Sequence, residues 1–183
     1  IELCKKIKNN NIALGKKHQP HISLMLGIFN GSSLKDIKTK IIQRISKIVN
    51  DNNLNIELNS GDLVQKGNYF FWNVKSNKKL SAICSKIQMA VKDLLFEKPP
   101  PPWLDKLPEK ERKKRLIYLN KYGTVNAKEY FTPHITVGYV NDDKLDKVNK
   151  IITNNYKFNV KSIGISRVGD YGTCLKNKII VNL

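Results

Sequence analysis

The sequence predicts an α+β fold in which a strand–helix–strand–strand unit occurs twice, giving two antiparallel sheets with flanking helices around a central cleft. Three observations lead to this prediction. Apolar residues make up 40% of the 183-residue chain, which is enough for a hydrophobic core. Extended apolar segments alternate with segments whose apolar residues lie three and four positions apart, as on one face of a helix. A run of prolines at residues 99–102, which favours neither helix nor central strand, separates the two copies.

The first copy opens with a predicted strand at residues 20–29, which ends at the Asn-Gly turn signal of residues 30–31. A helix follows, preceded by Ser33. Two strands at residues 54–64 and 68–76 come next, and a second helix completes the copy. The apolar positions that define these helices are Ile37, Ile41, Ile42, Ile45, Ile48 and Val49 in the first, and Ile83, Ile87, Ala90, Val91, Leu94 and Leu95 in the second.

The second copy repeats this order. Residues 131–140 predict a strand, and residues 142–153 predict a helix. Residues 158–168 and 173–183 predict two further strands around a turn at residues 169–172. The order of the strands within each sheet stays open.

Between the copies, residues 98–126 form a proline-rich, basic insertion. Within it, residues 108–122 predict a short helix with a proline at its start. A solvated linker helix and a phosphate-binding helix are equally consistent with its lysines and arginines. We therefore expect a single bilobal domain over residues 1–183, with lobes at residues 12–97 and 127–183.

The formal net charge of +18 favours a phosphate-bearing partner, RNA or a nucleotide, because neutralised phosphates release their counterions. Lysines that only solvate the surface are the alternative. No apolar run is long enough to cross a bilayer, so we expect no membrane partner. The oligomeric state stays open, and a monomer is consistent with the sequence.

The three cysteines, Cys4, Cys84 and Cys174, lie far apart and form no Cys-x-x-Cys pair. This spacing argues against a disulfide framework and against the common zinc sites. We therefore expect no metal, no cofactor and a reducing, cytoplasmic environment. The chain begins at Ile1 rather than Met, so a targeting signal removed from its N-terminus would leave no trace.

Two short motifs carry the candidate chemistry. The segments Pro-His-Ile-Ser and Pro-His-Ile-Thr place His21 two positions before Ser23, and His134 two positions before Thr136. Because alternate side chains of a strand share a face, each imidazole is expected to project together with its hydroxyl. The residues expected on the opposite, core-facing side are Ile22, Leu24 and Leu26 in the first strand, and Ile135, Val137 and Tyr139 in the second.

Such a pair of imidazoles suits the cleavage or formation of a phosphodiester bond. One group must remove a proton from the nucleophile and another must protonate the leaving oxygen, and imidazole serves in either state near neutral pH. The hydroxyls of Ser23 and Thr136 can donate hydrogen bonds to the non-bridging phosphate oxygens. No carboxylate cluster accompanies the histidines, so the site is expected to work without a metal.

At these residues the sequence resembles the 2H phosphoesterase superfamily, which contains 2′-5′ RNA ligase-like proteins and cyclic phosphodiesterases. Its signature of two His-x-Thr/Ser motifs is matched here by His21-Ile22-Ser23 and His134-Ile135-Thr136. The resemblance implies a bilobal α+β fold and metal-independent hydrolysis of 2′,3′-cyclic phosphates, of 2′-5′ linkages as in 2′-5′ oligoadenylate, or of RNA 3′ ends. It also implies that His134 is the base and His21 the acid when a cyclic phosphate is opened. The insertion at residues 98–126 lies outside the signature.

Other residues carry alternatives. Tyr171, in the turn at residues 169–172, is a candidate substrate contact or an ordinary turn residue. The aromatic block at residues 69–72 is predicted to be a core strand, with base stacking as the alternative. His18, which has no second copy, is expected to be exposed.

The same residues are consistent with two other functions. The cleft of such a fold can hold a nucleotide such as AMP without turnover, as a binding module. A basic RNA-binding protein would depend on its charge rather than on a cleft. The intact pairs of imidazoles and hydroxyls favour the phosphodiesterase.

Overall fold

The computed structural model describes residues 2–5, 7, 10–15, 18–29, 34–52, 55–75, 77–97, 99–141, 155–174 and 179–182. It divides into two compact units, each assembled from separate stretches of the chain. The sheet unit consists of Ile1–Ser23, Glu57–Ser76 and Pro133–Asn182, and the helical unit of Leu24–Ile56, Asn77–Thr132 and Leu183. The secondary structure is α+β, as predicted.

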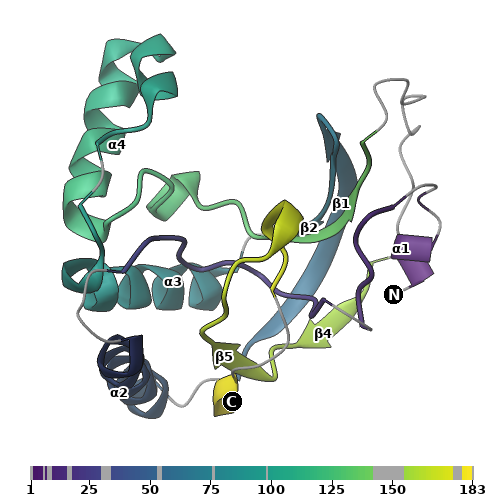
Figure 1. The fold of residues 1–183 in the computed structure, drawn as a ribbon, viewed down its shortest axis with the longest axis horizontal. Coiled ribbons are helices and arrows are strands. Elements are labelled where there is room, and N and C mark those ends of the chain that lie inside the picture. Colours follow the sequence, from purple (N-terminus) through teal and green to yellow (C-terminus); the bar gives the residue numbers. More distant parts are fainter. Residues whose placement is uncertain are drawn as a thin grey trace. The chain divides into compact units, whose positions relative to one another are not determined.

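The sheet unit is built on an antiparallel sheet with the strand order β3-β2-β1-β4. Its strands are β1 (Glu57–Lys66), β2 (Tyr69–Val74), β3 (His134–Tyr139) and β4 (Lys157–Asn159). β1 and β2 form a curved hairpin (Figure 1), whose turn contains Gly67 with a φ of 55°, a conformation that glycine adopts without steric cost. The strands predicted at the positions of β1, β2 and β3 are confirmed.

A smaller antiparallel sheet pairs β5 (Ser162–Gly164) with β6 (Ile179–Asn182). The prediction of one continuous strand at residues 158–168 is wrong. Its first residues extend the large sheet alongside β1, whereas its later residues turn to β6, so different pairing partners divide the segment. The helix predicted at residues 142–153 lies outside the described residues.

The core of the sheet unit lies on one face of β2 and β3. Phe70 from β2 and Ile135 and Val137 from β3 are buried there. Residues of the N-terminal segment, which includes α1 (Glu2–Lys5), complete the cluster with Cys4, Ile7, Ile12 and Leu14. Burial of one such aliphatic side chain contributes roughly 1.5–3 kcal/mol. This cluster therefore fixes which face of β3 points away from the core.

The helical unit contains α2 (Leu34–Asn52), α3 (Lys78–Val91) and α4 (Glu109–Tyr122). α3 packs against both α2 and α4, and α4 runs steeply away from one end of α3 (Figure 1). The helices predicted at the positions of α2, α3 and α4 are confirmed. The apolar faces of α2 and α3 are buried through Ile37, Ile41, Ile45, Val49, Ile83, Ile87 and Val91. Gly123, with a φ of 71°, ends α4 in the left-handed conformation that favours glycine.

The prediction that the proline run at residues 99–102 forms neither helix nor strand is wrong for its last residue. Pro102 is the first residue of the short 3-10 helix η2 (Pro102–Lys106). Proline is tolerated there because the amide N–H that it lacks has no partner in the first turn of a helix.

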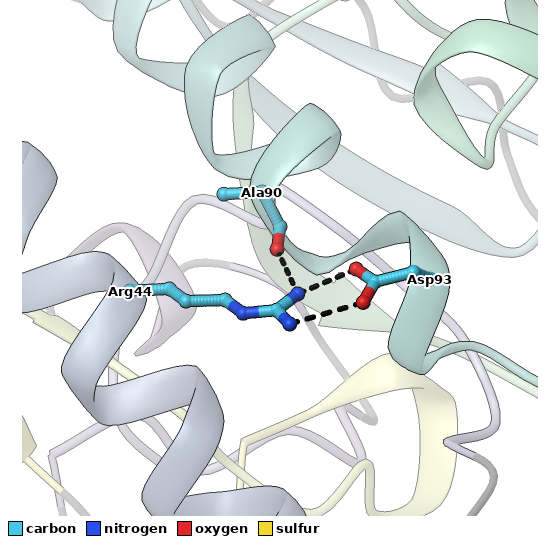
Figure 2. A network of polar contacts seen from close by, with 3 residues as sticks. All are labelled: Arg44, Ala90 and Asp93. Carbon is cyan, nitrogen blue, oxygen red and sulfur yellow. Dashed lines mark hydrogen bonds and ion pairs between the residues drawn. The ribbon is translucent and has the colours of Figure 1, made fainter.

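Arg44 connects α2 to the end of α3, as Figure 2 shows. Its guanidinium donates to the carbonyl of Ala90 at 2.6 Å and to the two carboxylate oxygens of Asp93 at 2.5 and 3.0 Å. The hydrogen bond from Arg44 lowers the pKa of Asp93 below its usual value of 3.8. This bidentate contact is therefore made by a charged pair at neutral pH.

The strand predicted at residues 20–29 is wrong. In the structure this segment forms no sheet ladder and makes only an isolated bridge at Phe29. Single contacts take up its backbone groups instead: the carbonyl of Leu24 accepts a hydrogen bond from Nε2 of Gln88 at 3.0 Å, and that of Ile28 accepts one from the Phe96 N–H at 2.6 Å. Leu26, expected to face a core, is 64% exposed. Apolar composition does not distinguish such a segment from a strand.

Candidate active site

The second motif lies on β3, in register with β2. His134 is opposite Asn73, and Thr136 is opposite Phe71. The ring of His134 also lies against Phe71, with the ring centroids 4.4 Å apart. His134 and Thr136 are half-buried whereas the intervening Ile135 is buried, so the predicted alternation is confirmed for these residues. Tyr139, expected on the core side, is half-buried and lies opposite Tyr69.

The aromatic block on β2 divides between the two faces of the sheet. Phe70 is buried in the core, and Trp72 packs against it. Tyr69 and Phe71 occupy the other face, stacked with centroids 5.7 Å apart, and Phe71 continues to His134. The prediction of a core strand is confirmed for alternate residues, and the other two rings form a row that leads to the candidate catalytic histidine.

The first motif lies outside the helices and strands, where contacts from outside the motif hold His21. Its Nδ1 is 2.9 Å from the carbonyl oxygen of Gln19. A carbonyl only accepts hydrogen bonds, so Nδ1 carries a proton. A side-chain hydrogen bond with Cys174 raises the pKa of His21 above 6.5, against burial, which lowers it, and the Gln19 carbonyl adds to the rise. These contacts therefore stabilise the imidazolium form of His21 relative to a free imidazole.

Cys174 is the partner of His21 in this contact and differs from the other cysteines. Burial raises the pKa of its thiol, but the hydrogen bond and charge of His21, together with a hydrogen bond from Ser166, lower it below 9.0. By contrast, burial raises the pKa of Cys4, and it raises the pKa of Cys84 to about 12. Each partner thus shifts the other towards its charged form, His21 towards the imidazolium and Cys174 towards the thiolate.

A hairpin at residues 168–174, closed by a β-bridge between its ends, contacts both motif-bearing segments. At its base, the carbonyl of Cys174 accepts a hydrogen bond from the Gln19 N–H at 3.3 Å. At its tip, Tyr171 stacks on Tyr139 of β3 with the ring centroids 4.2 Å apart. The predicted turn is confirmed, and it brings Cys174 to the first motif and Tyr171 to the strand of the second.

The other residues singled out from the sequence have fewer contacts that bear on their expected roles. Ser23 is exposed, and without strand geometry the alternation argument does not place its hydroxyl beside His21. The phosphate-binding roles of Ser23 and Thr136 stay predictions, as does substrate contact by Tyr171. His18 is half-buried rather than exposed, and its Nδ1 accepts a hydrogen bond from the Ala13 N–H at 3.2 Å.

The basic insertion uses much of its charge within the chain. Its ion pairs join Arg112 to Asp105, Lys113 to Glu109, Lys114 to Glu129 and Arg115 to Glu111. Arg115 also lies over the ring of Tyr130, with its guanidinium carbon 3.7 Å from the centroid, and over that of Trp103 at 5.3 Å. These contacts favour the structural interpretation of the insertion over the phosphate-binding one.

A metal site and a membrane-spanning helix each place requirements on the described part of the chain. No group of three or more His, Cys, Asp or Glu side chains among these residues is placed to hold a metal ion. Within the same ranges, no helix is both long and apolar enough to cross a membrane.

The sequence did not reveal Gln19, Phe71 or Cys174 as neighbours of the two histidines. Phe71 belonged to a recognised aromatic block, but only the register of β2 with β3 places it on His134. Cys174 follows the predicted turn, yet its approach to His21 depends on how the 168–174 hairpin folds back. Neither relationship has a signal in linear spacing.

The chain also has a family match. The family model of the 2′-5′ RNA ligase superfamily matches residues 4–171, which include both His-x-Ser/Thr motifs and end before Cys174. Neither the curated proteins nor the solved structures contain a match to the chain. This protein, whose paired motifs resemble those of the 2H phosphoesterases, therefore belongs to the 2′-5′ RNA ligase superfamily.

Proposed function

We propose that this protein is a metal-independent phosphodiesterase that acts on RNA ends or nucleotides through His21 and His134. Its substrates carry a 2′,3′-cyclic phosphate, a 2′-5′ linkage or an RNA 3′ end. Ser23 and Thr136 donate hydrogen bonds to the non-bridging phosphate oxygens. The proposal includes the duplicated, bilobal arrangement of a single domain as the origin of the two motifs.

The observation that carries the proposal is the presence of both motifs in one compact unit of a chain from this superfamily. Residues 21–23 and 134–136 are far apart in the sequence, yet both belong to the sheet unit. The 168–174 hairpin contacts the segment of His21 through Cys174 and the strand of His134 through Tyr171. These contacts support a common site, because one small element reaches both segments.

In the proposed reaction, one imidazole removes a proton from water and the water oxygen attacks the phosphorus. A new P–O bond forms while the bond to the ribose oxygen breaks, and the second imidazole protonates that leaving oxygen. The negative charge that gathers on the non-bridging oxygens is stabilised by the hydroxyls. For a cyclic phosphate the leaving oxygen remains on the same ribose, so the product is a ribose phosphomonoester.

The environment of His21 supports its role as the acid. Its raised pKa keeps the ring protonated to higher pH than a free imidazole, and its Nδ1 proton is directed to the Gln19 carbonyl. The proton on Nε2 is then the one available for transfer. His134 takes the role of base, with Phe71 against its ring.

The direct test is a substrate panel in the presence of EDTA. A 2′,3′-cyclic nucleotide, 2′-5′ oligoadenylate and a short RNA are incubated with the wild type and with His21→Asn and His134→Asn. We expect turnover of at least one substrate by the wild type and a loss of roughly a hundredfold or more in each variant, since each removes a proton-transfer group.

His18→Asn is the matched control, because asparagine can still accept the hydrogen bond from the Ala13 N–H. It should retain activity. Equal residual rates in the wild type and both catalytic variants would reject the proposal. Tight nucleotide binding in calorimetry without any product would instead establish a binding module.

A further inference from the structure

Cys174 is held beside His21 by backbone as well as side-chain contacts. The Gln19 N–H donates to the Cys174 carbonyl at 3.3 Å, and the Gln19 carbonyl accepts from Nδ1 of His21 at 2.9 Å. Gln19 therefore joins the backbone of Cys174 to the ring of His21. These two contacts place Cys174 next to His21, and the interaction of the thiol with the imidazole raises the pKa of His21.

The 168–174 hairpin, which carries this thiol, is held together by a β-bridge and hydrogen bonds. Its base is closed by the bridge between Val168 and Cys174, and the Gly169 N–H donates to the Thr173 carbonyl at 2.8 Å. Thr173 is buried, and its hydroxyl donates to the Asp170 carbonyl at 2.7 Å. These bonds restrict the backbone that carries the Cys174 thiol, so the fold sets where the thiol meets His21.

Cys174 is also the titratable side chain in or next to the 168–174 hairpin that changes the pKa of His21. The hairpin and the residue before it offer Arg167, Asp170, Tyr171 and Cys174, and of these Cys174 contributes to the pKa of His21. Conversely, His21 and the hydroxyl of Ser166 lower the pKa of the Cys174 thiol. The two side chains therefore form a mutually dependent pair.

We propose that Cys174 is a positioning residue for His21, which holds the imidazole oriented and protonated in the free protein until a substrate phosphate replaces the thiol. This inference rests on the proposed function, because it assigns His21 the role of acid. With Nδ1 directed to Gln19, Nε2 is the nitrogen left for the thiol, and it is also the nitrogen that must reach the substrate.

Replacement of the thiol by a phosphate is expected from the strengths of the two acceptors. Sulfur, even as a thiolate, is larger than oxygen and forms longer hydrogen bonds, whereas a phosphate oxygen forms short, charge-assisted hydrogen bonds with an imidazolium. The thiol can therefore keep His21 ready for proton donation without competing strongly with the substrate.

This replacement predicts a difference between two pH profiles. The profile of kcat/KM reports groups in the free enzyme, whereas that of kcat reports groups in the substrate complex. Cys174→Ala should move the basic limb of the kcat/KM profile to lower pH, because His21 loses the partner that raises its pKa. The basic limb of the kcat profile should stay in place.

Cys174→Ser separates the orientation of the imidazole from its protonation. Its hydroxyl can hold the ring but does not ionise near neutral pH, so kcat/KM should return to the wild-type value at acidic pH while the basic limb stays shifted. Cys84→Ala, which removes a buried thiol of the helical unit, is the matched control and should move neither limb. An unmoved limb in Cys174→Ala, or no rescue at acidic pH by Cys174→Ser, would overturn the proposal.

An NMR titration of isotope-labelled histidine in the full chain provides a readout without turnover. His21→Gln assigns the His21 resonances, and Cys174→Ala should lower the His21 pKa relative to the wild type. An unchanged titration would refute the role of Cys174 even in an active enzyme. If the wild type cleaved none of the substrates but the titration moved, the pairing would stand while the proposed phosphodiesterase activity would be rejected.

Discussion

Phe71 lies against His134 with the two ring centroids 4.4 Å apart and the ring planes inclined by 57°. Inclined aromatic pairs of this kind contribute roughly 0.5–1.5 kcal/mol beyond the area that they bury. Phe71 is itself stacked on Tyr69, whose ring meets Tyr139 edge-on at 4.7 Å. Phe71, the ring in direct contact with His134, therefore restricts the orientation of the imidazole that we assign as the base.

This arrangement predicts that Phe71→Leu lowers kcat by about tenfold, because a loosened imidazole spends less time in the geometry for proton abstraction. KM should change little, since the proposal gives Phe71 no contact with the substrate. Steady-state kinetics on the best substrate of the panel measures both constants. Tyr69→Leu is the matched control, as it alters the same face of β2 one alternate position away from Phe71. An equal loss of kcat in both variants would attribute the effect to the sheet rather than to His134.

The sequence predicted those parts of the fold that depend on local pattern. Segments with apolar residues three and four positions apart form α2 and α3. α4 begins directly after Pro108 and ends directly before Gly123, which are typical start and end signals of a helix. β1, β2 and β3 also follow their patterns. The failures, at residues 20–29 and 158–168, have another cause. Both segments are apolar and extended, but the partners that decide their pairing lie elsewhere in the chain.

The same limit applies to the candidate site. The two His-x-Ser/Thr motifs were visible because each is a continuous string of residues. The contacts that prepare the imidazoles were not, since Phe71 reaches His134 through strand register and Cys174 reaches His21 through a hairpin. Linear spacing therefore predicts which groups react, and tertiary contacts set their protonation and orientation.

The contrast among the three cysteines predicts selective alkylation of Cys174. The thiolate is the form that attacks iodoacetamide, with formation of an S–C bond and release of iodide. At neutral pH the lowered pKa of Cys174 gives it a larger thiolate fraction than Cys4 or Cys84, whose pKa values are raised by burial. Mass spectrometry of peptides should find the label first on Cys174 in the wild type.

His21→Gln supplies the pH test of this prediction. Without the imidazole, the pKa of Cys174 should rise, so labelling should slow at neutral pH and approach the wild-type rate only well above the usual thiol value of 9.0. His18→Asn, which alters the third imidazole, should leave the rate unchanged. A labelling rate that ignores the His21 substitution at every pH would contradict the pairing of imidazolium and thiolate.

The contact between Arg44 and Asp93 predicts a pH-dependent contribution to the stability of the helical unit. Both side chains are partly exposed, so Asp93→Asn should lower the free energy of unfolding at neutral pH by about 1 kcal/mol or less. The folded pKa of Asp93 is lowered, so this stabilisation is present above the unfolded pKa and is lost as the pH falls through the folded value.

Urea unfolding over a series of pH values checks this sign, because the curves of the wild type and Asp93→Asn should converge only in acid. Asp51→Asn, in the last turn of α2, is the matched control. It should not lower the stability, since a carboxylate gains nothing from the negative end of a helix dipole. If the wild type and Asp93→Asn unfold alike at neutral pH, solvent screening cancels the ion pair. The Arg44 hydrogen bond to the Ala90 carbonyl is then the polar contact of Arg44 that adds to the apolar packing of α2 on α3.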